Sequence, residues 1–173
     1  MERILISETP KYTGEVVRLA GWVHIRRDHG KLIFIDLRDR SGIIQMIVVP
    51  DHADAYNVAK DVRSEFVIEI EGKVKARPGG AQNDKLSTGS VEIEVEQMKI
   101  LSVAENPLPF SLIEENLELN LKTLLDHRSL SVRNPKINAI FRTYSVMLRA
   151  YAESLSKDGF LEIKTPKILQ IVL

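Results

Sequence analysis

The chain has 173 residues, of which 44% are hydrophobic and 28% are charged, and these are the proportions of an ordinary globular protein. The 24 basic and 24 acidic residues balance, so net charge does not point to a nucleic-acid partner, and the absence of cysteine excludes disulfides and thiolate metal sites. No apolar run approaches the ~20 residues of a membrane span, and the N-terminus lacks a signal-peptide core. We therefore expect a soluble, cytoplasmic protein with no membrane attachment.

The first hundred residues are typical of β-structure, because apolar and polar residues alternate in runs that turn residues separate. Gly21 interrupts the first run and indicates a bend or bulge there. A short helix is expected after the third run, with Asp51 as its N-cap. The expected strands are 16–27, 32–37, 43–49, 66–74 and 91–103, and the expected helix is 53–63.

Three strands, a helix and two further strands follow the order of the OB-fold, a five-stranded barrel that binds oligonucleotides across its second and third strands. On pattern alone, another small barrel remains an alternative. We predict a mainly β protein whose OB-fold spans residues 1–103.

The remaining seventy residues have a different pattern. Residues 104–133 contain prolines and mix acids with leucines, which indicates a hinge with one short helical piece. Asn134 and Pro135 form a favoured helix start, and an apolar stripe from Ile137 to Leu155 predicts a long helix that ends at Gly159. We expect a strand over 160–163. The stripe has no evident partner in the chain, so we expect this segment to dimerise or to be poorly held.

No catalytic site is evident in the sequence. Residues 77–80 lack the Lys-Ser/Thr ending of a phosphate loop, and the four histidines do not have metal-ligand spacing. Binding chemistry is better represented, since a single-strand binder needs aromatic faces for bases and cations for phosphates. Phe34 lies in the middle of the second strand, with Arg27 on the strand before it, and Gln45 offers a donor and an acceptor to a base edge. Periodicity alone leaves Phe34 equally suited to the core.

Three motifs of the first hundred residues carry a family resemblance: 21–45 (GWVHIRRDHGKLIFIDLRDRSGIIQ), 72–78 (GKVKARP) and 88–93 (TGSVEI). They are similar to the anticodon-binding domain of aspartyl-tRNA synthetases of the bacterial type, which belong to class II. Residues 125–135 (LDHRSLSVRNP) resemble the segment that links the hinge to the catalytic domain, and 159–168 (GFLEIKTPKI) resemble motif 1. The resemblance implies that 134–173 opens a class II catalytic domain, with its first helix and the motif 1 strand.

The resemblance also implies roles for individual residues. Phe34 would stack on the central anticodon base, while Arg27 and Gln45 would bond base edges. Lys75 and Arg77 would contact the anticodon stem-loop. The motif 1 residues Phe160 and Pro166 would belong to a homodimer interface. The implied partner is a tRNA, with no role for DNA.

Histidine at position 29 accompanies relaxed family members that accept both the aspartate and the asparagine tRNA, whereas leucine accompanies strict ones. The resemblance therefore suggests a non-discriminating enzyme. The segment 128–133 (RSLSVR) departs from the usual RYLDLR, which points to a divergent subgroup and leaves an asparaginyl-type synthetase as an alternative.

The family's ATP-clamping motifs 2 and 3 do not occur in the 173 residues, and the family's aspartate-binding segment is replaced by residues 170–173. We accordingly expect the chain alone to be inactive and to hold no cofactor, whereas the full-length family uses ATP and Mg²⁺. A truncated synthetase is one interpretation of the sequence. A free-standing OB-fold module that binds RNA in its own right is the other.

Overall fold

The computed structural model describes residues 1–114 and 116–166. The chain divides into two compact units, Met1–Leu108 and Pro109–Leu173, and this division lies within the segment 104–133 expected to be a hinge. Part of the motif 1 resemblance, residues 167 and 168, and the ending 170–173 lie outside the described residues.

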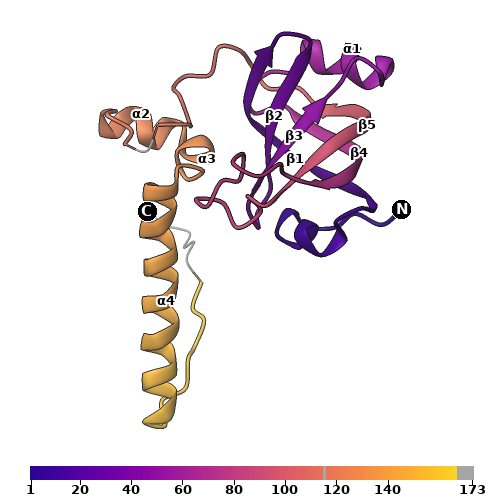
Figure 1. The fold of residues 1–173 in the computed structure, drawn as a ribbon. Coiled ribbons are helices and arrows are strands. Elements are labelled where there is room, and N and C mark those ends of the chain that lie inside the picture. Colours follow the sequence, from indigo (N-terminus) through magenta and orange to yellow (C-terminus); the bar gives the residue numbers. More distant parts are fainter. Residues whose placement is uncertain (115, 167–173) are drawn as a thin grey trace. The chain divides into compact units, whose positions relative to one another are not determined.

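The first unit is a closed five-stranded barrel with the neighbour order β1-β2-β3-β5-β4, as Figure 1 shows. All neighbouring strands are antiparallel except β3 and β5, which pair in parallel. This is the predicted OB-fold. Its elements are η1 (Ile6–Tyr12), β1 (Val16–His29), β2 (Leu32–Arg38), β3 (Ile43–Val48), α1 (Ala53–Asp61), β4 (Val67–Ala76) and β5 (Val91–Ser102).

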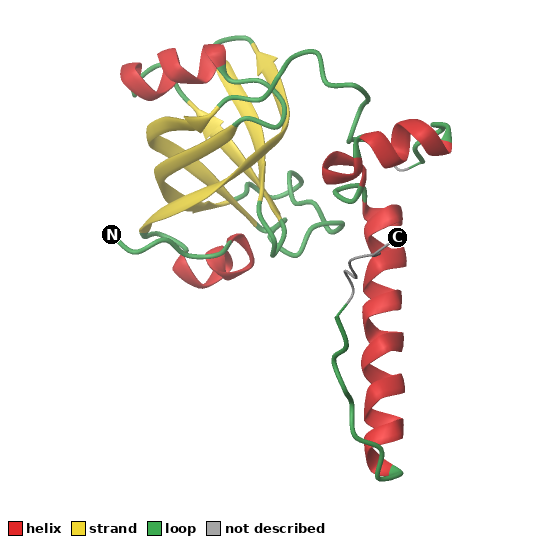
Figure 2. Ribbon diagram, turned by 180° about the vertical axis from the view of Figure 1, so that it is seen from behind, coloured by secondary structure: helices red, strands yellow, loops and turns green. Residues whose placement is uncertain are grey.

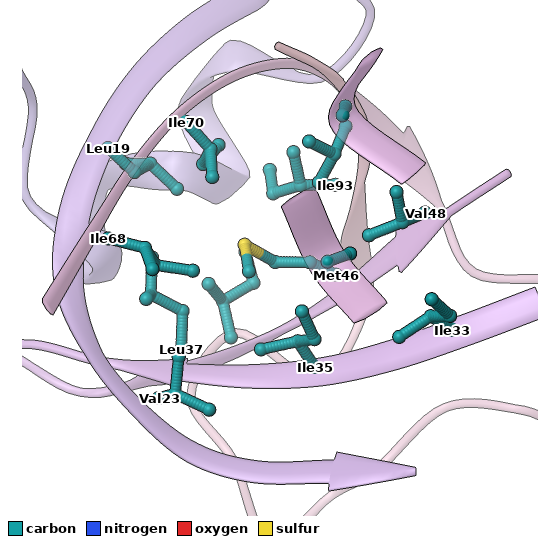
Figure 3. Packing of buried hydrophobic residues seen from close by; sticks show 14 of the residues in the cluster. Leu19, Val23, Ile33, Ile35, Leu37, Met46, Val48, Ile68, Ile70 and Ile93 are labelled. Atoms are coloured by element: carbon teal, nitrogen blue, oxygen red, sulfur yellow. The ribbon is translucent and has the colours of Figure 1, made fainter. Parts of the chain in front are cut away.

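Alternation along each strand builds the barrel core. On β2, the side chains of Ile33, Ile35 and Leu37 are buried, while the residues between them face outward. Figure 3 shows these three side chains directed into the barrel together with apolar residues of the other strands. The two short helices lie at opposite ends of the barrel in Figures 1 and 2, and each contributes buried apolar side chains, Ala55 and Ala59 from α1 and Ile6 from η1. The core is therefore closed within the unit.

Two local expectations for this unit are wrong. The register of β1 against β2 shifts between Val23 and Ile25, so the irregularity lies at His24 rather than at Gly21. Gly21 is required for a different reason, because a Cβ there would lie 2.3 Å from the backbone oxygen of Arg38. The N-cap of α1 is His52 rather than Asp51, and His52 makes no capping hydrogen bond through its side chain.

The second unit is helical, with α2 (Leu121–Asp126), α3 (Arg128–Ser131) and α4 (Pro135–Lys157). The predicted start of α4 is confirmed, because Asn134 Oδ1 accepts hydrogen bonds from the backbone N–H groups of Lys136 and Ile137, with Pro135 at the first turn. No side chain of α4 is buried. None of the described helices is both long and apolar enough to cross a membrane.

The expected strand over 160–163 is wrong. Residues 160–166 have no regular secondary structure, and they run back alongside α4 (Figure 2). A strand needs a neighbour to satisfy its backbone hydrogen bonds, and the second unit contains no other strand among its described residues. The segment and α4 border an apolar groove of about 380 Å³ instead.

Candidate nucleic-acid interface

The predicted binding residues of β1, β2 and β3 share the outer side of the barrel. Arg27 lies directly opposite Phe34, because the β1–β2 hairpin closes with only Gly30 and Lys31 between paired strand ends. Gln45 lies opposite Asp36, two residues along the same side of β2 from Phe34. Phe34 is partly exposed and alternates with buried isoleucines, so its ring belongs to the outer side rather than to the core.

Two lateral rows of side chains cross the strands on this side. One row contains Ile25, Asp36, Gln45, Glu92 and Lys75, and the other contains Arg27, Phe34, Ile47, Glu94 and Lys73. We call these ten residues the outer face. Directly opposed side chains in a sheet are close enough to interact, so the face is continuous from β1 to β4.

Asp36 holds one edge of the Arg27 guanidinium. Arg27 Nη2 donates to both carboxylate oxygens of Asp36, at 3.1 and 3.0 Å. The Asp36 side chain is only 14% exposed, whereas that of Arg27 is 52% exposed. Burial raises the pKa of Asp36, and the charges of Arg27, His24 and Arg77 oppose this shift. The contact therefore fixes a half-exposed cation next to the ring of Phe34.

Gln45 and Lys75 are also paired with carboxylates of the face. Gln45 Nε2 donates to Glu92 Oε2 at 3.2 Å. The ammonium group of Lys75 forms an ion pair with Glu94, and Lys75 remains about half exposed. Three carboxylates that the sequence pattern does not single out, those of Asp36, Glu92 and Glu94, thus hold the predicted contact residues in position.

Arg77 differs from the other predicted contacts because it is buried, with 7% exposure. It follows the last residue of β4, and its guanidinium donates to the backbone oxygens of Val91, at 3.1 Å, and Ala81, at 3.4 Å. These bonds tie the loop between β4 and β5 to its own base. Among the described residues, Nη2 of Arg77 has no hydrogen-bond partner, and this nitrogen is itself buried rather than open to a ligand.

His29 ends β1 and is exposed at the tip of the first hairpin. Gly30 follows with a φ of +62°, the left-handed conformation that a two-residue hairpin turn requires. Position 29 is therefore presented beyond the sheet, at the same end of β1 as Arg27.

A second polar network lies beside Asp36. His24 Nδ1 lies 3.1 Å from Nη1 of Arg38, and since a guanidinium only donates, Nδ1 is the acceptor. Nη2 of Arg38 donates to the buried Glu65 at 2.7 Å. Burial lowers the pKa of His24, and the charge of Arg38 lowers it further, whereas Asp36 and Glu65 act against the shift.

The motif 1 residues lie in the second unit. Phe160 is 65% exposed and Pro166 is also exposed. The apolar stripe of α4 is equally open to solvent, with exposed fractions of 43% for Phe141 and 67% for Tyr151. These residues present apolar surface rather than groups able to perform chemistry.

The barrel face offers a partly exposed ring flanked by hydrogen-bond donors, which is suited to an unpaired base. A base can stack on Phe34, while a planar guanidinium and an amide beside it can read base edges. Cations farther along the face can contact phosphates, which position a nucleic acid without reading its sequence.

Comparisons with known proteins agree with this geometry. Residues 17–101 match the family of the OB-fold nucleic acid binding domain, and residues 120–172 match the tRNA synthetases of class II (D, K and N). Together the two matches include all of α4 and the barrel strands except the first residue of β1 and the last residue of β5.

Individual relatives support the same family. The chain is 47% identical over 163 residues to the aspartate–tRNA(Asp/Asn) ligase of Dictyoglomus turgidum. The aligned region covers 92% of this chain but only 27% of that ligase. The aspartyl-tRNA synthetase structure from Entamoeba histolytica superposes with a TM-score of 0.83 at 25% identity, over 98% of this chain and 40% of that one. The asparaginyl-tRNA synthetase from Pyrococcus horikoshii, complexed with asparaginyl-adenylate, gives a TM-score of 0.75 at 33% identity. The superposition covers 96% of this chain and 37% of that synthetase. The chain thus belongs to the aspartyl-tRNA synthetase family, of which it carries the OB-fold domain and the beginning of the class II synthetase domain.

Proposed function

We propose that the chain binds the anticodon loop of a tRNA, as the anticodon-binding part of an aspartate–tRNA ligase. One observation carries the proposal: Phe34 is partly exposed on the outer side of β2 with Arg27 directly across from it. The match to the OB-fold nucleic acid binding domain covers this part of the barrel and supports the assignment.

Each polar residue has a role that its position suits. The central anticodon base stacks on Phe34, and Arg27 and Gln45 donate to base edges in the same loop. Lys75 meets the phosphates of the stem-loop, where an ammonium acts as a point charge. Arg77 orders the loop between β4 and β5 through its bonds to Val91 and Ala81, so it supports the stem-loop contact through this loop.

A comparison of two RNAs tests the proposal. A stem-loop with the triplet GUC and the same stem-loop with an unrelated triplet are titrated with the chain over a range of salt concentrations. We expect the GUC stem-loop to bind more tightly at every salt concentration, because base contacts add to a shared phosphate contribution. Equal affinities would favour the alternative of a free-standing RNA-binding module without triplet preference.

Recognition of the asparagine tRNA is a second candidate function. The ligase from Dictyoglomus turgidum is named for both tRNAs, and the structure from Pyrococcus horikoshii is an asparaginyl-tRNA synthetase. His29 at the exposed hairpin tip would permit this relaxed choice. Stem-loops with GUC and GUU, which differ at one base, distinguish the possibilities. Binding within a few-fold of each other supports a non-discriminating chain, and a strong preference for GUC contradicts it.

The activity of the whole ligase is part of the same proposal. In it, aspartate is activated with ATP and Mg²⁺ by a catalytic domain, and the protein acts in the cytoplasm. Within residues 1–114 and 116–166 no group of three His, Asp or Glu side chains could hold a metal ion, so no described residue is assigned to these cofactors.

A homodimer formed through motif 1 also belongs to the proposal. The exposed Phe160 and Pro166, together with the open stripe of α4, provide apolar surface for such an interface. Sedimentation over a range of concentrations tests this point: a self-association that Phe160→Ser weakens supports it, and a monomer at all concentrations contradicts it.

A further inference from the structure

The side chains of β1 change phase part of the way along the strand. Up to Val23 the odd-numbered residues after the first point into the core, whereas the odd-numbered Arg27 lies on the outer side, opposite Phe34. His24 causes the change, because it is one extra residue between the pairs that flank it and so forms a β-bulge. The bulge therefore decides which of two successive arginines, Arg26 or Arg27, lies on the outer face.

The sequence also allows a register of β1 against β2 without the bulge. Each residue beyond the bulge would then shift by one position, and its side chain would change sides of the barrel wall. Ile25 would continue the buried series of β1. Arg26 would lie opposite Phe34, and Arg27 would turn inward. The hairpin would close over three residues, 29–31, a common loop length with a glycine in the left-handed conformation. Since this register would bury the now only partly buried Ile25, hydrophobic patterning does not select the observed one.

Arg26 makes a contact that depends on the observed register. It lies opposite Ile35, whose side chain points into the core, and its Nε donates to the backbone oxygen of Ala59 at 3.1 Å. Ala59 is buried in the last turn of α1, where carbonyl oxygens have no N–H partner within the helix. In the other register Ile25 would occupy this place, and an apolar side chain cannot donate to that oxygen.

The two neighbouring arginines are thus suited to different tasks. Arg26 is engaged twice, since its Nη2 also donates to Asp28 at 2.8 Å, and its side chain is 21% exposed. The side chain of Arg27 is 52% exposed on the outer face. The first arginine connects the hairpin to α1, and the second remains accessible to a ligand.

We infer that Arg26 is a positioning residue for RNA recognition: by satisfying the end of α1, it fixes the register in which Arg27 lies beside Phe34. The inference rests on the proposed function, since it takes the contact of Arg27 with base edges from there. It goes beyond that function because Arg26 acts through the helix at the end of the barrel and through the hairpin, without a contact of its own to a base.

Nuclear magnetic resonance contacts between backbone protons of opposed residues report the register without RNA. Wild type should show Arg27 against Phe34. Arg26→Met keeps the apolar stem of the side chain but removes its donors, so contacts of position 26 with Phe34 should appear. Arg63→Met is the matched control, because Arg63 also donates to backbone oxygens at the end of α1 but belongs to no strand. It should leave the register unchanged.

Affinity of the full chain for the GUC stem-loop is the second measurement. Arg26→Met should lower it by about five- to a hundredfold, the range of one bidentate arginine contact to a base, because Arg27 turns inward. Deleting His24 from this variant removes the extra residue, so a regular ladder again places Arg27 opposite Phe34. Most of the lost affinity should then return.

The outcomes separate the inference from the proposed function. If wild type does not prefer GUC over an unrelated triplet, the proposed function fails and the role of Arg26 in recognition fails with it. If wild type does prefer GUC, two results overturn the inference alone: Arg26→Met keeps the contacts of Arg27 with Phe34, or deletion of His24 restores no affinity, as a direct contact of Arg26 to the RNA would require. Fluorescence of Trp22 reports whether each variant is folded, and a barrel that Arg26→Met unfolds would show that Arg26 serves the fold instead.

Discussion

The two units of the chain bury their apolar side chains to very different extents. In Met1–Leu108, nineteen buried residues form one cluster inside a closed barrel. In the described part of Pro109–Leu173, the buried apolar side chains are those of Phe110 and Leu112, and the stripe of α4 is open to solvent. The barrel therefore has a complete apolar core of its own and can fold by itself, whereas α4 exposes an apolar surface that suits a partner.

The largest expected effect is on the free energy of unfolding, when matched isoleucines are replaced in the two units. Ile35→Ala removes a fully buried side chain from the barrel and should lower the free energy of unfolding by about 2–5 kcal/mol. Ile140→Ala on α4, where the side chain is 64% exposed, should change it by no more than about 0.5 kcal/mol. Urea unfolding measures both free energies. Fluorescence of the single tryptophan, Trp22, follows the barrel, and circular dichroism follows the helices. Equal losses at the two positions would contradict the comparison.

Within the barrel, a substitution on the outer side should affect RNA binding more than stability. Phe34→Ala should weaken binding of the GUC stem-loop by about 1–3 kcal/mol, or about five- to a hundredfold, because a stacking surface is lost. Its effect on unfolding should be smaller than that of Ile35→Ala, since Phe34 is only partly buried. Ile47→Ala, a neighbour on the same outer face, serves as the control for a general loss of apolar surface. RNA binding that survives Phe34→Ala would refute the proposed stacking.

The helical unit should depend on its cap rather than on a core. Asn134→Ala removes the hydrogen bonds to the N–H groups of Lys136 and Ile137 and should destabilise α4 by about 0.5–2 kcal/mol. Asn134→Asp keeps the capping oxygen but loses the hydrogen bond that Nδ2 of Asn134 donates to the backbone oxygen of Glu114 at 2.8 Å, so it should restore only part of the loss. Hydrogen exchange of the first turn of α4 reports the effect, while exchange in the barrel should stay unchanged. Faster exchange in the barrel, or no change in α4, would show that the cap does not control this unit.

The difference between the units also explains what the sequence alone could predict. The alternation of Ile33, Ile35 and Leu37 with Phe34 and Asp36 is local, so the strand follows from period alone, whereas periodicity did not decide whether Phe34 faces the core or the outer side. The cap at Asn134 is local as well. The sequence therefore predicted the barrel order and the start of α4 correctly.

Features that depend on cross-strand register could not be predicted in this way. The pair of Arg27 and Asp36 exists because the hairpin closes over two residues and the irregularity falls at His24, and composition does not reveal either fact. Arg77 resembles Lys75 in sequence spacing, but β4 ends at Ala76 and the chain turns its guanidinium inward. The strand expected at 160–163 was wrong for a related reason, since strand pairing depends on residues distant in sequence.

The smallest expected effect concerns pH and acts on the barrel alone. The pKa of His24 in the folded chain is lowered, mainly by burial and then by the charge of Arg38, so the unfolded chain takes up a proton there more readily. Unfolding free energy should therefore fall as the pH drops through about 6.5, the ordinary range of histidine, and the contribution of His24 is fully present above it. His24→Asn keeps an acceptor for Arg38 but cannot titrate, so it should flatten this dependence, whereas His29→Gln at the exposed hairpin tip should preserve it. Trp22 fluorescence reports the barrel transition, and since His24 belongs to the barrel, the helical signal of α4 should not follow the same curve. An unchanged pH dependence in His24→Asn would show that the histidine is not desolvated as its contacts with Arg38 imply.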